Sequence, residues 1–184
     1  MRAHDTVTVT IILSLVLVFL PLHAIAQSPP VGLWNLDTPA DLTTADVGND
    51  LVLVGSHAYV EGTEPGDGAA RIGSGSHYIC DHDIPANGGG AYVNEYTVVM
   101  DIKTFGRGLW HCFLQTNQTN SNDGDVFSDY PGRAGIGSTG YSFPRMLDAR
   151  TWYRIAIVVD NGDRFEIYAD GILILDGTSQ SVDG

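Results

Sequence analysis

The clearest alternation of apolar and polar positions lies in residues 151–177, near the C-terminal end of the chain. Residues 155–159 are continuously apolar, and in residues 164–168 the apolar Phe165 and Ile167 alternate with polar neighbours. Successive side chains of a strand point to opposite faces, so this pattern predicts strands with one buried face and one face in water.

Two short turn sequences separate these apolar runs. Asn161-Gly162 stands between the first two, and Asp170-Gly171 precedes the apolar residues 172–175. Asn-Gly and Asp-Gly favour type I′ turns, in which both central residues have φ > 0. The segment therefore predicts an antiparallel meander of three strands.

Shorter strand-like runs cover most of the remaining chain, with turn signals about every 8–12 residues, the spacing expected of a sandwich. They are expected at residues 31–37, 51–54, 57–61, 70–82, 95–104 and 108–116. No convincing helical period occurs after residue 26. The 22 glycines also suit a turn-rich protein. We predict an all-β fold of two antiparallel sheets.

Residues 1–26 have the pattern of a secretory signal peptide. Arg2 provides a basic start, residues 11–20 are apolar, and Ala24-Ile25-Ala26 supplies small residues before a cleavage site. An uncleaved membrane anchor is the alternative, but the apolar run is short for a spanning helix. We expect a signal peptide at 1–26, a spacer at 27–30 and one domain at 31–184, secreted, extracellular or periplasmic.

The charge of the chain restricts its partners. The formal net charge is −13, with one lysine and eight arginines. Binding to phosphates requires clustered cations, so nucleic acid is not expected as a partner, nor is a membrane after signal cleavage. The acidic surface fits a soluble extracellular protein, or one that collects divalent cations on Asp-rich loops.

Two segments carry a resemblance to a known family. The sequence WYRIAIVVD at 152–160, followed by FEIYADG at 165–171, resembles the late hairpin of laminin-G-like domains in the concanavalin-A-like lectin/glucanase superfamily. The runs YTVVMDIK at 96–103 and WNLD at 34–37 resemble its central and first strands. The resemblance covers residue 31 to the end and implies a two-sheet jelly roll. Laminin-G-like modules also stand at the front of secreted hydrolases, phosphoesterase-like ones among them.

The resemblance also implies that further strands follow the Asp-Gly hairpin. Laminin-G-like domains usually continue past the Asp-Gly hairpin with strands that pair back near the N-terminus, whereas this sequence stops at Gly184. Either a sheet edge is exposed, or the sequence is the N-terminal part of a longer secreted protein. We expect the second, with a fold that is C-terminally incomplete.

A polar loop provides a candidate calcium site. Asn122, Asp123 and Asp125 could converge through a turn at Gly124, and hard oxygen ligands are those that Ca²⁺ selects. The loop is not an EF-hand, because its glycine falls one place early. A polar hairpin loop without metal is the alternative. Many members of the resembled family hold calcium on rim loops.

Two cysteines, Cys80 and Cys112, predict a single disulfide in a secreted chain, with two free thiols as the alternative. Zinc is not favoured. His111 and Cys112 are neighbours in a predicted strand and point to opposite faces, so they do not converge with His77, Cys80 and His82.

Candidate catalytic residues are few. The glucanases among the resembled proteins carry Glu-x-Asp-x-x-Glu on one strand, which this chain lacks; Glu166 and Asp170 are the nearest pair. Neither a Gly-x-Ser-x-Gly elbow nor a phosphate-binding loop occurs. We therefore expect no catalysis by this domain alone.

Aromatic residues supply a candidate ligand face. Trp110, Tyr130 and Tyr141 could stack on sugar rings, although Trp110 could instead belong to the core. The sequence predicts a secreted, non-catalytic module that binds extracellular glycan or protein. The alternatives are a polysaccharide-acting hydrolase or lyase, an accessory domain of a secreted hydrolase such as a phosphoesterase, and a structural spacer.

Overall fold

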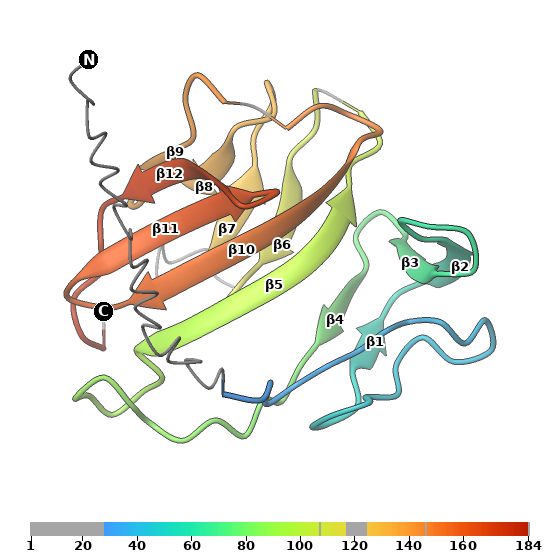
Figure 1. The fold of residues 1–184 in the computed structure, drawn as a ribbon, viewed down its shortest axis with the longest axis horizontal. Helices are drawn as coiled ribbons and strands as arrows, with labels where there is room; N and C mark the ends of the chain where they lie inside the picture. The colour runs from blue at the N-terminus through green and yellow to red at the C-terminus, as the bar shows by residue number, and fades with distance from the viewer. Residues whose placement is uncertain (1–27, 107, 117–124, 146, 184) are drawn as a thin grey trace, which may run out of the picture.

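The computed structural model describes residues 28–106, 108–116, 125–145 and 147–183 (Figure 1). All regular structure in these residues is β-strand, and every strand pairing is antiparallel. The prediction of an all-β protein is confirmed. The predicted signal peptide lies outside the described residues, and within them no helix could span a membrane.

The first four-stranded sheet, here called the β10 sheet, has the order β12-β11-β10-β5. Its strands are β5 (Glu95–Lys103), β10 (Trp152–Asp160), β11 (Arg164–Ala169) and β12 (Ile172–Gly177). The last three form the predicted meander. Ile155, Ile157, Phe165 and Ile167 are fully buried, as their alternation along the strands predicts.

The two turns of the meander differ from each other. Asp170 and Gly171 have φ of 49° and 76°, so both central residues are left-handed, as expected for a type I′ turn. At the other turn only Gly162 is left-handed, with φ of 93°, and the expected type I′ geometry is wrong there. Asp160 pairs with Arg164 in register, so this loop has three residues and not the two of a type I′ hairpin. The Asn161 backbone N–H is also used outside the hairpin, where it donates to the Asn94 carbonyl at 2.9 Å.

The second four-stranded sheet, the β7 sheet, lies behind the first in Figure 1 and has the order β6-β7-β8-β9. Its strands are β6 (His111–Leu114), β7 (Val126–Ser128), β8 (Ala134–Ile136) and β9 (Gly140–Tyr141). Val126, Ala134 and Leu147 pack against the buried face of the β10 sheet and form one core. This arrangement is consistent with a β-sandwich.

The two long sides of the sandwich are not alike. Beside β12, the Thr178 backbone N–H donates to the Thr139 carbonyl at 2.9 Å and ties the two sheets together. On the other side, β5 pairs with β10 alone among the described strands, so it is an edge strand of its sheet. The apolar residues on its inner face are only partly buried: Tyr96, Val98, Met100 and Ile102.

The N-terminal part forms two small sheets. In one, β1 (Val52–Val54) pairs with β4 (His77–Ile79); in the other, β2 (His57–Glu61) pairs with β3 (Gly68–Ile72). The strand predicted at 31–37 is not formed. Leu33 makes an isolated bridge to Val47, and the Asn35 N–H donates to the Asp46 carboxylate. The backbone of this segment is therefore bonded partly to a side chain, and it does not form a continuous ladder of hydrogen bonds with a second strand among the described residues.

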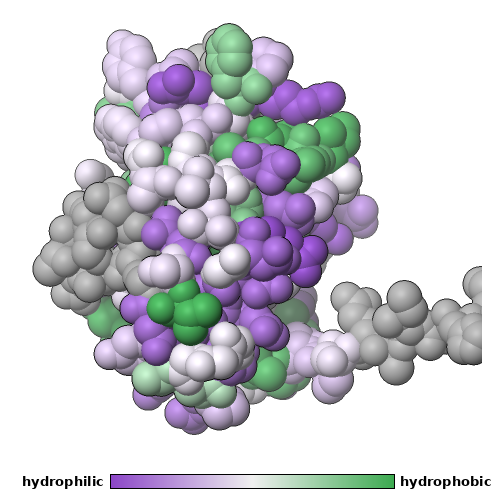
Figure 2. Space-filling view, turned by 90° about the vertical axis from the view of Figure 1, so that its left-hand side faces the viewer, coloured by the Kyte–Doolittle hydropathy of each residue, from purple (hydrophilic) through white to green (hydrophobic). Residues whose placement is uncertain are grey.

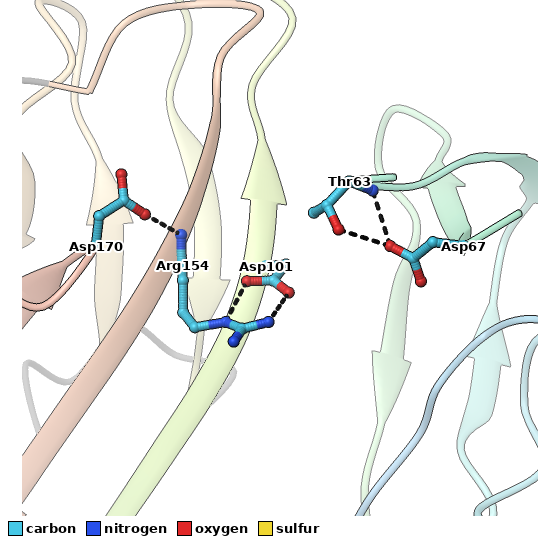
Figure 3. A network of polar contacts seen from close by, with 5 residues as sticks. All are labelled: Thr63, Asp67, Asp101, Arg154 and Asp170. Atoms are coloured by element: carbon cyan, nitrogen blue, oxygen red, sulfur yellow. Dashed lines mark hydrogen bonds and ion pairs between the residues drawn. The ribbon is translucent and has the colours of Figure 1, made fainter. Parts of the chain in front are cut away.

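An ion pair holds β10 to β5 on the outer face. The Arg154 guanidinium donates from Nε and Nη2 to the two carboxylate oxygens of Asp101, at 2.8 and 2.6 Å (Figure 3). Asp101 raises the pKa of Arg154 above its usual value.

A carboxylate closes the turn between β2 and β3. Asp67 accepts hydrogen bonds from the Thr63 N–H at 2.8 Å and from the Thr63 hydroxyl at 2.7 Å (Figure 3), and these contacts lower the pKa of Asp67.

Candidate functional site

Three loops meet at one end of the sandwich, the upper end in Figure 1. They are residues 104–110, 129–133 and 142–151, and we call their described residues the loop rim. Backbone hydrogen bonds join each loop to the next: Gly108 N–H to the Tyr130 carbonyl at 3.0 Å, Leu147 N–H to Gly132 at 2.8 Å, and Arg150 N–H to Thr104 at 2.7 Å. The rim is therefore one connected surface.

Aromatic side chains form a platform beside the rim. The centre of the Trp110 ring lies 6.4 Å from the centres of both the Phe127 and the Tyr141 rings. The interplanar angles are 75° and 67°, so both pairs are edge-to-face. Phe127 and Tyr141 stand on the β7 sheet on either side of Gly135, which pairs with both in register. We call Trp110, Phe127 and Tyr141 the aromatic platform.

Of the three aromatic residues predicted from the sequence, Trp110 and Tyr141 are in contact, and Tyr130 lies separately on the loop rim. Trp110 is 60% exposed, so the alternative that it belongs to the core is wrong. Tyr130 is 66% exposed and lies on the loop rim, with its ring near Gly108. Phe127 was not predicted as a site residue, because the sequence pattern of a three-residue strand is the same whether its phenylalanine faces the core or the surface.

An arginine and a buried aspartate fix one side of the platform. The Arg133 guanidinium lies 5.1 Å from the centre of the Tyr141 ring, and its Nε donates to the Asp129 carboxylate at 2.8 Å. Asp129 also accepts the Arg133 backbone N–H at 2.7 Å and is almost completely buried. These contacts with Asp129 hold the guanidinium in place within cation–π distance of the Tyr141 ring.

The predicted calcium ligands are divided. Asn122 and Asp123 lie outside the described residues. Asp125 is fully buried, with one carboxylate oxygen bound by the Thr116 N–H at 2.8 Å and the other without a hydrogen-bond partner among the described residues. Within the described ranges, no group of three or more His, Cys, Asp or Glu residues is placed to hold a metal ion. Calcium at this loop stays a prediction.

Cys80 and Cys112 are both free and exposed, so the Cys80–Cys112 disulfide is not formed in this structure. The Cys112 sulfur donates to the Leu114 carbonyl at 3.6 Å. Partial burial, together with the charge of Asp125, raises the pKa of Cys112 to about 11, which keeps this thiol protonated at neutral pH.

The two carboxylates weighed for catalysis have structural contacts. The Tyr168 hydroxyl donates to Glu166 at 2.9 Å, and the Arg154 backbone N–H donates to Asp170 at 2.9 Å. Asp170 lines a pocket of about 320 Å³ together with Arg145, Leu147, Tyr153, Ala169, Ile172 and Ile174. Glu166 does not line this pocket.

His111 predicts a pH dependence of stability. Burial lowers its pKa below the usual 6.5, and its buried Nδ1 has no partner among the described residues. The unfolded chain therefore binds the proton more readily, and the free energy of unfolding should fall as the pH drops below 6.5.

Thermal unfolding of wild type and His111→Gln, followed by circular dichroism from about pH 7.5 to 5.5, tests this. The variant should show a shallower dependence of its melting temperature on pH, whereas His77→Gln, at an exposed position on β4, should follow wild type. Equal slopes for wild type and His111→Gln would contradict the prediction.

Comparison with known proteins gives no match: no family model, no curated protein and no solved structure is significantly similar to this chain. The resemblance to laminin-G-like domains therefore rests on the sequence motifs themselves, and the geometry of the loop rim and platform carries the functional argument.

Proposed function

We propose that this protein is a secreted, non-catalytic recognition module that binds an extracellular glycan on its aromatic platform. The observation that carries the proposal is the exposed Trp110 on the loop rim, whose ring makes edge-to-face contacts with Phe127 and Tyr141. A soluble protein leaves so large an apolar ring exposed at a cost, which binding offsets.

Sugar rings suit such a surface. One face of a pyranose is lined by C–H groups and packs on an aromatic ring, while its hydroxyls need polar partners at the edge. Tyr130 offers a phenolic hydroxyl on the rim, and the Arg133 guanidinium borders Tyr141. Because Asp129 already holds Arg133 in place, little side-chain freedom is lost on binding.

Three further parts of the proposal are supported by sequence. A jelly-roll connection of the two sheets follows the laminin-G-like motifs, export follows the residue 1–26 pattern, and calcium at Asn122, Asp123 and Asp125 follows the acidic loop. An extracellular protein is the other partner that the platform would suit, since exposed tryptophan and tyrosine are frequent anchors in interfaces.

The proposal predicts that Tyr130→Ala weakens binding to a glycan that the wild type recognises. A stacked aromatic side chain contributes about 1 kcal/mol, so we expect a loss of about 5-fold, and a larger loss for Trp110→Ala. The measurement is isothermal titration calorimetry with a polysaccharide identified on an array of plant, microbial and animal glycans.

Tyr92→Ala is the matched control. Tyr92 is 69% exposed, close to the 66% of Tyr130, but it lies next to Asp183, before β5 and away from the rim. Its replacement should leave binding unchanged. Equal losses for Tyr92→Ala and Tyr130→Ala, or unchanged binding by Trp110→Ala, would exclude the platform as the binding surface.

A further inference from the structure

Cations gather on the loop rim of a protein whose overall charge is strongly negative. The rim and the adjoining end of β5 carry Lys103, Arg133, Arg145 and Arg150, against the acidic Asp129 and Asp148 among the described residues. The formal charge of the whole chain is −13. In Figure 2 the same upper end of the molecule shows strongly hydrophilic residues directly beside hydrophobic ones.

Two of these cations line one pocket. Among the described residues, Lys103, Phe105 and Arg150 line an open surface pocket of about 400 Å³ at the end of β5. The Lys103 amine lies 4.6 Å from the centre of the Trp152 ring, a cation–π contact with its partner in register on β10. Arg150 is positioned by its backbone, with a φ of 63° and a 2.7 Å hydrogen bond from its N–H to the Thr104 carbonyl.

Neither cation is neutralised within the part of the chain that the structure describes. The ion pairs there join Arg133 to Asp129 and Arg154 to Asp101, and none includes Lys103 or Arg150. Two positive charges that line one pocket both attract an anion placed between them, and these two attractions oppose the repulsion between the cations. The pocket is therefore suited to an anionic group.

Phe105, which also lines the pocket, indicates what kind of molecule could carry the anionic group. Phe105 is 56% exposed and offers an apolar ring next to the two charges. The arginine fork matches a planar carboxylate, and a uronic acid carries a carboxylate directly on its sugar ring. Such a residue can place its carboxylate between Lys103 and Arg150 while its ring packs on Phe105.

We propose that the Lys103–Phe105–Arg150 pocket is a subsite for the carboxylate of a uronic acid residue, so that the ligand is an acidic polysaccharide. This inference rests on the proposed glycan binding and adds the chemical class of the glycan. The aromatic platform holds sugar rings without regard to charge, and the pocket selects the chain that carries carboxylates.

The test compares two polymers with one backbone: polygalacturonate and its methyl ester, in which the carboxylate charge is removed. Binding to each is measured by calorimetry for wild type and for Lys103→Met/Arg150→Met. We expect wild type to bind polygalacturonate at least 10-fold more tightly than the ester, and the double variant to lose most of this difference, since hydrogen bonds to a charged group are stronger than those to a neutral one.

Arg71→Met/Arg164→Met is the matched control, because it removes the same net charge at two exposed positions on β3 and β11. It should retain the preference for polygalacturonate. If both double variants lose it equally, general electrostatic attraction explains the preference and the subsite is overturned.

A pocket-only measurement separates this inference from the proposed function. Methyl galacturonide is titrated while the indole signal of Trp152 is followed by NMR. A saturable shift that disappears in Lys103→Met/Arg150→Met supports the subsite, even if Trp110→Ala leaves polymer binding unchanged and the platform fails. Equal affinity for polygalacturonate and its ester overturns the subsite and leaves glycan binding intact. Absence of any shift, or an equal response to inorganic sulfate, also overturns it.

Discussion

Replacing Phe165 by alanine should lower the free energy of unfolding by about 4 kcal/mol, which is typical for truncation of a buried phenylalanine. Phe165 is fully buried and belongs to the same core cluster as Val159, its partner in register on β10. The loss combines the transfer free energy of the ring with a cavity between two sheets that cannot close freely. Chemical denaturation followed by tryptophan fluorescence measures it.

Phe105→Ala is the control for this change. It deletes the same atoms from a ring that is 56% exposed on the loop rim, and it should alter the unfolding free energy by less than about 1 kcal/mol. A loss of less than 1 kcal/mol for Phe165→Ala as well would show that the two sheets do not pack as a sandwich around this ring.

Gly135→Ala is expected to destabilise the protein by about 3 kcal/mol, through backbone strain and a steric clash. Gly135 has a φ of 136°, which L-residues rarely adopt, and a Cβ there would approach the Gly140 carbonyl oxygen to 2.0 Å. The obstacle is backbone of the neighbouring strand β9, so relief requires the sheet itself to move. The measurement is again chemical denaturation.

Gly137→Ala is the matched control, two residues further along the chain. A Cβ at Gly137 meets no atom within 4 Å, and its φ lies outside the left-handed range, so we expect a change of at most about 0.5 kcal/mol. Equal stability of the two variants would contradict the β8–β9 pairing. Because Gly135 lies between Phe127 and Tyr141, Gly135→Ala should also disturb the aromatic platform.

The sequence predicted those features that depend on residues close together in the chain. Alternation in residues 164–168 located the buried face of β11, since side-chain direction in a strand depends only on the position of each residue. Asp170-Gly171 predicted its turn for the same reason. The type I′ prediction failed at Asn161, where the backbone contact comes from Asn94, a residue 67 positions away.

The assembly of the candidate site could be predicted only in part from the sequence. The sequence identified Trp110, Tyr130 and Tyr141 by residue type, but it could not indicate that Trp110 and Tyr141 touch or that Phe127 joins them. Their contact depends on the register of strands in the β7 sheet. A shift of one residue would turn Phe127 or Tyr141 to the opposite face of the sheet, and local pattern does not determine register between distant strands.

The sequence by itself determined that this is an all-β protein, with an acidic composition and a meander near its C-terminal end. Only the tertiary structure decided that Lys103 and Arg150 line one pocket, because that proximity arises from the pairing of β5 with β10 and the loop bond between Thr104 and Arg150. Composition gives the net charge of −13, but the positions of individual charges in space follow from long-range packing.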